Sequence, residues 1–186
     1  MNVNKFIISK NISSRYLVHQ ILEGVFINRR TKPQTFDYLE KKQIFFEEKD
    51  IAQAERITNF IFGHLESIDS KVLIYLKKKT NISVLNIFRI VIAEIALNEA
   101  PNYALVNSAV DLARISFKTK YFLNLINAVS RTLVAKHQEI EFEFKGNLES
   151  TLKSYLVKNY SEAIADNIEN IYTLNSTIDI TIINLG

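Results

Sequence analysis

The 186-residue chain contains no cysteine, and this absence excludes several kinds of chemistry. Without a thiol, the chain forms no disulfide, holds no Cys-ligated zinc and offers no thiolate nucleophile. A chain without disulfides fits the reducing cytoplasm, so we expect a cytoplasmic protein.

Glycine and proline are also scarce, with four and two residues. The glycines are widely dispersed, so the chain has no G-x-G-x-x-G turn to hold a dinucleotide. The three histidines lack the spacing of metal ligands. We therefore expect no cofactor, no metal and no enzymatic activity in this chain.

Long hydrophobic runs are missing too. Uncharged stretches fall short of the roughly 18–20 residues that a membrane span needs, so we expect no membrane contact. The N-terminal segment MNVNKFIISKNISSRY lacks the long apolar core and the cleavage site of a signal peptide. Hydrophobic residues still make up 47% of the chain, which is typical of a folded globular protein.

Helical patterning is the strongest positive signal, most clearly in residues 87–134. Apolar side chains recur at three- and four-residue steps from Phe88 to Ala96, so they share one helical face. Pro101 ends this helix, and Asn102 is suited to cap the next one. A third apolar helix completes the stretch.

Caps and apolar stripes predict further helices before this stretch. We expect a helix from Ser13 or Ser14, a short helix or loop over residues 36–44, a helix capped by Asp50, a helix over residues 67–79, and a cap at Ser83.

The C-terminal part has a looser pattern. Residues 137–145 alternate apolar and acidic side chains, which fits a strand or a linker. Two helices follow, Leu148–Tyr160 and Ser161–Tyr172, with Ser161 as a cap. The β-branched run Ile178–Ile183 predicts a terminal strand. We therefore predict an all-α bundle over residues 1–138 and, over residues 139–186, a linker, two helices and a strand-like segment.

Three segments of the central stretch together resemble the NusB-like helical domain. They are Arg89–Ala96 (RIVIAEIA), Ala100–Arg114 (APNYALVNSAVDLAR) and Leu125–Arg131 (LINAVSR). In order and spacing they are similar to its R-x-[AG]-[LI]-[YA]-[EQ]-[LI], P-x-x-A-x-V-N-E-A-V-E-L-A-[KR] and [FL]-[VI]-N-[AG]-V-L-R patterns, with Ser108 in place of the usual Glu. The resemblance implies an all-α, NusB-like bundle that binds RNA.

Within this family, the chain looks more like the N-terminal domain of RsmB-type 16S rRNA cytosine-5 methyltransferases than like antitermination factor NusB. Arg131, Leu148–Tyr160 and Ile178–Thr181 carry this resemblance, although the tryptophan of the later helix is absent. Cytosine C5 methylation needs a thiolate that this chain lacks. The resemblance therefore implies the non-catalytic helical half of such an enzyme, and we expect the methyltransferase region to follow residue 186.

Basic residues concentrate near the N-terminus. Residues 1–34 have a net charge of +5, whereas the whole chain has +3, so the remainder carries −2. In NusB-like domains the basic N-terminal region faces RNA, and the resemblance transfers this role most directly to three arginines of the segment. The alternative is a solvated helix end. We predict contacts with RNA, specifically rRNA, at Lys10, Arg15, Arg29, Arg30 and Lys32.

Other cations are secondary candidates for the same surface. Lys77–Lys79 can extend it, but we favour a solvated cap at the end of the helix over residues 67–79. Lys118, Lys120 and Arg131 are comparable candidates.

A second hypothesis is a protein-interaction module. In this case the chain pairs with a ribosomal protein as an antitermination factor, or with a separately encoded methyltransferase catalytic half. An unpaired terminal strand favours this hypothesis, because such a strand can add to a partner's sheet.

Overall fold

The computed structural model describes residues 13–76, 78–98, 100–136 and 150–173. The first part of the chain forms α1 (Ser13–Phe26), α2 (Lys32–Lys41), α3 (Glu48–Gly63), α4 (Leu65–Leu73), α5 (Ile82–Ala96), α6 (Asn102–Ile115), the short 3₁₀ helix η2 (Lys120–Phe122) and α7 (Leu123–Ala135). The last described part forms α8 (Ser150–Asn159) and α9 (Glu162–Thr173).

All of these elements are helical, which confirms the all-α prediction. The described residues include no strand. The predicted terminal strand, Ile178–Ile183, and the alternating segment 137–145 lie outside the described residues.

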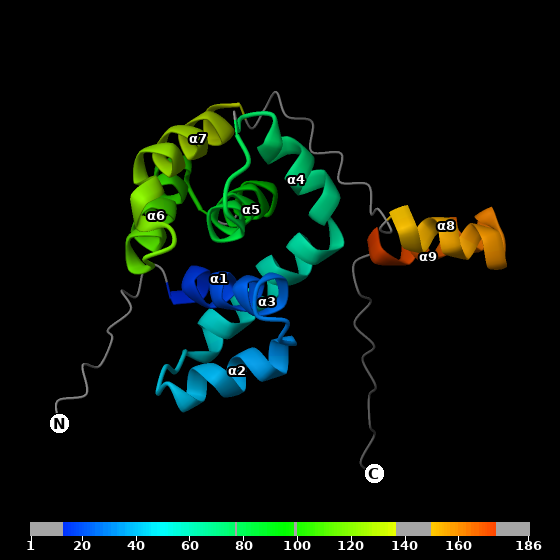
Figure 1. Cartoon of the computed structure of the whole chain (residues 1–186), viewed down its shortest axis with the longest axis horizontal. Helices are drawn as coiled ribbons and strands as arrows, with labels where there is room; N and C mark the ends of the chain where they lie inside the picture. The colour runs from blue at the N-terminus through cyan, green and yellow to red at the C-terminus, as the bar shows by residue number, and fades with distance from the viewer. Residues whose placement is uncertain (1–12, 77, 99, 137–149, 174–186) are drawn as a thin grey trace, which may run out of the picture. The chain divides into compact units, whose positions relative to one another are not determined.

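Helix α5 lies at the centre of the first unit, surrounded by α1, α3, α4, α6 and α7 (Figure 1). Its sequence is apolar on nearly every side, which is typical of a buried helix. From Ser83 to Glu94, every residue except Leu85 is buried. The ring of Phe88 is fully enclosed, and burial of a side chain of this kind contributes about 1.5–3 kcal/mol to stability.

The starts of α3 and α5 differ in detail from the predicted ones. Asn81, not Ser83, caps α5: its Oδ1 accepts a hydrogen bond from the backbone N–H of Val84 at 2.8 Å, and Ser83 lies inside the helix. Glu47 occupies the N-cap of α3. Asp50 instead lies in the first turn, where its carboxylate favours the positive end of the helix.

Proline stands at the start of two helices. Pro33 lies in the first turn of α2, after Thr31, whose backbone N–H donates to the Gln34 side chain at 2.8 Å in a capping box. Pro101 is the N-cap of α6, so Asn102 is the first helical residue and not the cap. Proline suits a helix start because the backbone N–H that it lacks would have no helical partner there.

Two bidentate ion pairs join the helices around α5. Arg15 Nε of α1 donates to Glu94 Oε2 of α5 at 2.9 Å, and Arg15 Nη2 lies 2.7 Å from Glu94 Oε1 in the same ion pair. Arg89 of α5 donates to Asp69 of α4 from Nε at 2.7 Å and from Nη2 at 2.6 Å. The Arg89 guanidinium also lies 4.5 Å from the centre of the Phe26 ring. Two-pronged contacts of this kind fix the orientation of both side chains.

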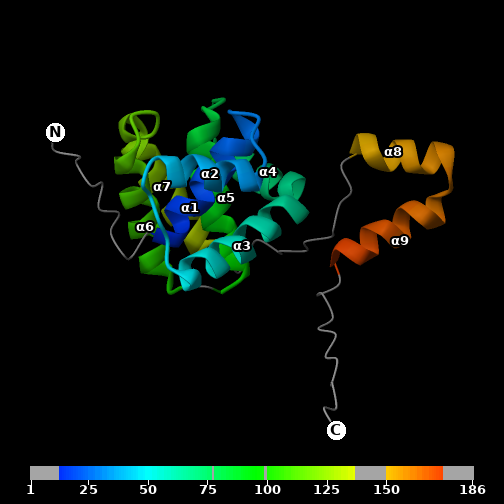
Figure 2. The ribbon, with the colours of Figure 1, turned by 90° about the horizontal axis from the view of Figure 1, so that it is seen from below.

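Contacts divide the chain into two compact units, between residues 143 and 144. In the second unit, α8 and α9 form a helical hairpin (Figure 2). The predicted cap of α9 is confirmed, because Ser161 Oγ accepts a hydrogen bond from the Ile164 N–H at 3.2 Å. Lys153 of α8 joins the two helices through Glu169, at 2.6 Å, and Asp166, at 3.2 Å.

Candidate nucleic-acid interface

The described cations among the five predicted to contact RNA do not share one surface. Lys10 lies outside the described residues. The Arg15 side chain is only 11% exposed, and the Glu94 carboxylate holds its Nε and Nη2. This geometry gives Arg15 a structural role, and its contact with RNA stays a prediction. The other three cations lie together where α1 connects to α2.

Gly24 allows α1 and α2 to meet closely at this connection. Its backbone carbonyl accepts a hydrogen bond from the Arg30 N–H at 2.9 Å, just after the end of α1. A Cβ at Gly24 would lie 2.2 Å from Thr35 Oγ1 of α2, which is too close for any other residue without a shift. Arg29 turns the chain between the helices with a φ of 55°, and its side chain is exposed.

Arg29 and Arg30 border a shallow hollow of about 480 Å³. The guanidinium carbon of Arg30 lies 4.0 Å from the centre of the Tyr38 ring, in a cation–π contact. Lys32 instead pairs with Glu55 of α3 at 2.7 Å. We call this surface the α1–α2 corner, defined by the residues that line the hollow, Arg29, Arg30, Gln34, Asp37, Tyr38 and Lys41, together with the adjacent Lys32.

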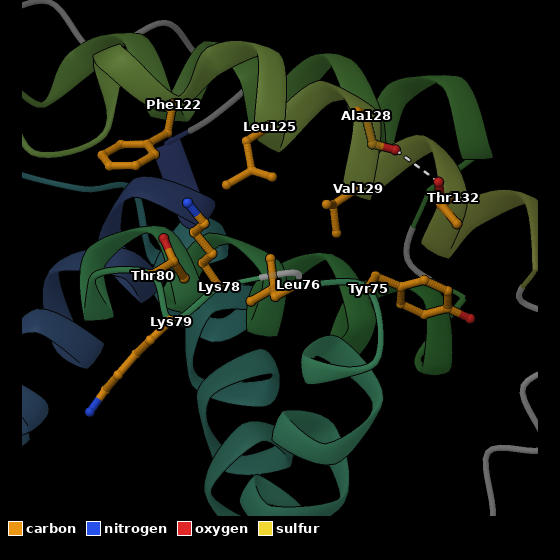
Figure 3. A pocket seen from close by; sticks show the side chains of 10 residues that line it. All are labelled: Tyr75, Leu76, Lys78, Lys79, Thr80, Phe122, Leu125, Ala128, Val129 and Thr132. Carbon is orange, nitrogen blue, oxygen red and sulfur yellow. Dashed lines mark hydrogen bonds between the residues drawn. The ribbon is translucent and has the colours of Figure 1, made fainter.

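A larger hollow, of about 640 Å³, lies between α7 and the connection from α4 to α5 (Figure 3). Its inner surface is apolar: Leu125 and Val129 point from α7 towards Leu76 of the connection. Figure 3 shows Phe122 near one end of the hollow and Tyr75 near the other. We call it the α4–α7 groove.

Two lysines border this groove. Lys78 and Lys79 are exposed, and Figure 3 shows Lys78 reaching towards α7 while Lys79 points away from it. No carboxylate among the described residues pairs with either ammonium group. The predicted helix over residues 67–79 is too long, because α4 ends at Leu73 and Leu76 lines the groove. These lysines therefore lie in an irregular connection, where they do not cap a helix end.

Sequence reasoning missed the α4–α7 groove. Phe122, Leu125 and Val129 recur at helical spacing, which predicts a buried stripe. Val129 is buried as expected, but Phe122 and Leu125 remain half-exposed in the wall of the groove. Only the neighbouring run of lysines pointed to this surface.

The described histidines and carboxylates do not gather into one site. No three His, Asp or Glu side chains among them lie close enough to hold a metal ion. His19 is buried, its Nε2–H donates to the Ser83 carbonyl at 3.0 Å, and burial lowers its pKa. None of the helices within the described ranges is long and apolar enough to cross a membrane.

Comparisons with known proteins agree with this architecture. In the solved structure "Crystal Structure of a Plectonemic RNA Supercoil", one chain shares the fold with a TM-score of 0.58 at 16% identity, over 72% of this chain and 99% of that chain. A search of curated proteins found no match. The model of the NusB family, a family of non-catalytic RNA-binding domains involved in antitermination, matches residues 12–135. That match spans well over half of the sequence, and the chain therefore belongs to the NusB family.

Proposed function

We propose that this chain binds single-stranded segments of RNA in the α4–α7 groove and catalyses no reaction on them. The observation that carries the proposal is the combination of an apolar inner surface with two exposed lysines at the border. Sites for unpaired RNA combine apolar or aromatic surfaces, which cover the bases, with cations that contact the phosphates. The groove supplies both.

The α1–α2 corner is suited to a second contact with the RNA backbone. Arg29 and Arg30 border a hollow, and a guanidinium can hold a phosphate through two parallel hydrogen bonds. Lys32 contributes less in this proposal, because Glu55 already neutralises it. The corner therefore adds affinity that is largely independent of the base sequence.

Ribosomal RNA is the target class that we propose. The support is the resemblance of Arg131 and of the Leu148–Tyr160 segment to the helical half of RsmB-type 16S rRNA methyltransferases. In this proposal, residues 1–138 form the RNA-binding domain, and residues 139–186 lead towards a methyltransferase region.

Two exposed apolar side chains favour a second candidate function. Leu73 and Ile74, at the end of α4, are 55% and 77% exposed. Adjacent apolar groups on a surface suit a protein partner. The candidate is an antitermination factor that pairs with a ribosomal protein or with a separately encoded catalytic half.

The test of RNA binding is the Lys78→Glu/Lys79→Glu double variant. Fluorescence anisotropy with a labelled single-stranded fragment of 16S rRNA, repeated over a range of salt concentrations, measures affinity and salt dependence. We expect affinity to fall roughly tenfold or more at low salt, and the salt slope to fall by about 0.7 for each phosphate that the variant no longer neutralises. Thermal unfolding should be unchanged, because both side chains are exposed.

Lys158→Glu, at an exposed lysine of α8, is the control for net charge beside the single Lys78→Glu and Lys79→Glu variants. Wild-type affinity in the double variant would contradict the groove as the binding site. A purified ribosomal protein that binds the chain while the rRNA fragment does not would instead support the second candidate.

A further inference from the structure

The turn between α6 and α7 exposes two aromatic rings that the proposed groove does not use. Phe117 is 78% exposed and Tyr121 is 79% exposed. Both values are high for aromatic side chains, which normally bury most of their surface. We call residues 116–122 the aromatic turn.

Hydrogen bonds hold the aromatic turn in place. Thr119 is fully buried, and its Oγ1 donates to the carbonyl of Ala113 at 2.7 Å. The backbone carbonyl of Lys118 accepts a hydrogen bond from Asn81 Nδ2 at 3.0 Å. The side-chain Nζ of Lys118 pairs with Glu23 of α1 at 3.2 Å. The turn is thus tied to α6, to the cap of α5 and to α1. The exposure of its rings is therefore built into the fold.

A lysine between the two rings in sequence contacts both of them. Lys120 Nζ lies 3.8 Å from the centre of the Phe117 ring and 4.9 Å from that of Tyr121. These cation–π contacts gather two ring faces and one positive charge at a single place. Glu23, the acid joined to this turn, is already paired with Lys118. The turn therefore suits a ligand that combines flat rings with negative charge.

The aromatic turn and the α4–α7 groove share one short helix, η2. Tyr121 is followed by Phe122, which lines the groove, and Lys120, Tyr121 and Phe122 together form η2. A polymer strand that leaves the groove beside Phe122 is therefore close to the residues of the turn. Single-stranded RNA fits this arrangement, because every base can stack on an aromatic side chain whatever its identity.

We propose that Phe117 and Tyr121 form a base-stacking platform, which extends the RNA path from the α4–α7 groove over the start of α7. The platform rests on the proposed function, since it binds the next unpaired nucleotides of the same strand. Lys120 contacts their phosphates. The platform adds affinity without reading the base sequence, because stacking is tolerant of base identity.

The absence of tryptophan from the chain allows a direct test. Phe117→Trp places a single fluorescent indole on the platform of the 186-residue protein. Addition of single-stranded RNA of mixed sequence should quench its emission through stacking. Phe45→Trp is the matched control: Phe45 is 72% exposed between α2 and α3 and borders neither the groove nor the turn, so its emission should stay constant.

Affinity measurements separate the platform from the groove. Phe117→Ala and Tyr121→Ala should each weaken binding by about fivefold or more, with the salt slope unchanged, because no charge is removed. Tyr121→Phe should bind as wild type, and Tyr103→Ala, at a tyrosine of α6 that is 72% exposed, should have no effect.

Three outcomes would overturn the platform. If Lys78→Glu/Lys79→Glu weakens RNA binding but Phe117→Ala/Tyr121→Ala does not, the groove stands and the platform fails. If RNA binds without changing the Phe117→Trp emission, stacking is excluded. A change in that emission with protein concentration alone would assign the rings to self-association. If the wild-type protein binds no RNA, the proposed function itself fails.

Discussion

The two ends of α1 hold their cations in opposite ways. Near its start, Arg15 forms an ion pair with the Glu94 carboxylate, which is only 1% exposed, so the Arg15 side chain is largely buried. Beyond its end, Arg29 is exposed in the α1–α2 corner, and Arg30 lies against Tyr38. All three arginines belong to the same basic N-terminal segment. One short stretch of chain thus supplies both an arginine in an internal ion pair and two arginines at the surface of the α1–α2 corner.

This difference shows why segment charge does not identify a binding surface. Glu94 is 79 positions from Arg15, so no local pattern reveals their pairing. A buried carboxylate requires a counter-charge, and the packing of α1 on α5 brings Arg15 to it. No buried carboxylate fixes the position of Arg29, which follows instead from the tight turn beside Gly24.

Arg15→Ala should produce the largest effect, and that effect should be on stability. Loss of one partner leaves Glu94 buried without its counter-charge, which costs about 3–5 kcal/mol. Urea unfolding followed by circular dichroism at neutral pH measures the change. Replacing both partners, as Arg15→Met with Glu94→Leu, should recover most of the loss. Reduced RNA affinity in folded Arg15→Ala protein would contradict this division of roles and support the RNA contact predicted from sequence.

Gly24→Ala should give the next largest effect, because it disturbs the base of the α1–α2 corner. The new Cβ would lie 2.2 Å from Thr35 Oγ1, so α2 has to move, at a cost of about 1–3 kcal/mol. Thermal unfolding measures this loss. In a Thr35→Ala background the clash disappears, and the same change should stabilise α1 through the higher helix propensity of alanine. An equal loss in both backgrounds would show that the close approach is not what requires glycine.

The helices were largely predictable from the sequence, whereas their ends were less so. Apolar residues at helical spacing located α1, α5, α6 and α7, because the helix face that packs on the core carries apolar residues every three or four positions. The sequence predicts Ser83 as the cap of α5, but Asn81 holds that position, since several polar residues there can accept the same hydrogen bond. The apolar pattern predicts too long a fourth helix, because Leu76 continues that pattern although it lies beyond α4 and lines the groove.

The candidate site was harder to predict, because it depends on contacts between distant segments. Composition located the cations, and Arg29 does lie at a surface, but Arg15 was grouped with it. The groove forms only when the connection around Leu76 packs beside Leu125 of α7. In the sequence alone, the spacing of Leu125 is the same as that of a core residue.

Arg29→Glu/Arg30→Glu tests whether the exposed arginines beyond the end of α1 contact RNA. We expect roughly tenfold weaker binding of the 16S rRNA fragment at low salt, a loss that shrinks as salt screens the phosphates. Anisotropy titrations measure it, and Lys158→Glu controls for net charge beside the single Arg29→Glu and Arg30→Glu variants, each of which reverses one charge as the control does. The free energy of unfolding should change by less than about 0.5 kcal/mol, because neither side chain is buried. Unchanged affinity would remove the corner from the proposed RNA path.

The smallest effect should be a pH dependence of stability that comes from His19, on the buried face of α1. Burial lowers the pKa of His19 below its ordinary value of 6.5, although nearby Glu23 opposes this shift. At pH values just below 6.5 the unfolded chain therefore binds more protons than the folded one, and the stability from neutral His19 is lost as pH falls.

Urea unfolding at a series of pH values between about 7 and 5 should detect this loss in the wild-type protein and a smaller one in His19→Gln. Residues 27–41 contain no histidine, so Arg29→Glu/Arg30→Glu should keep the wild-type pH dependence and serves as the matched control. Equal slopes in His19→Gln and wild type would mean that protonation of His19 does not limit stability. The two ends of α1 would then differ in the placement of their arginines but not in their response to acid.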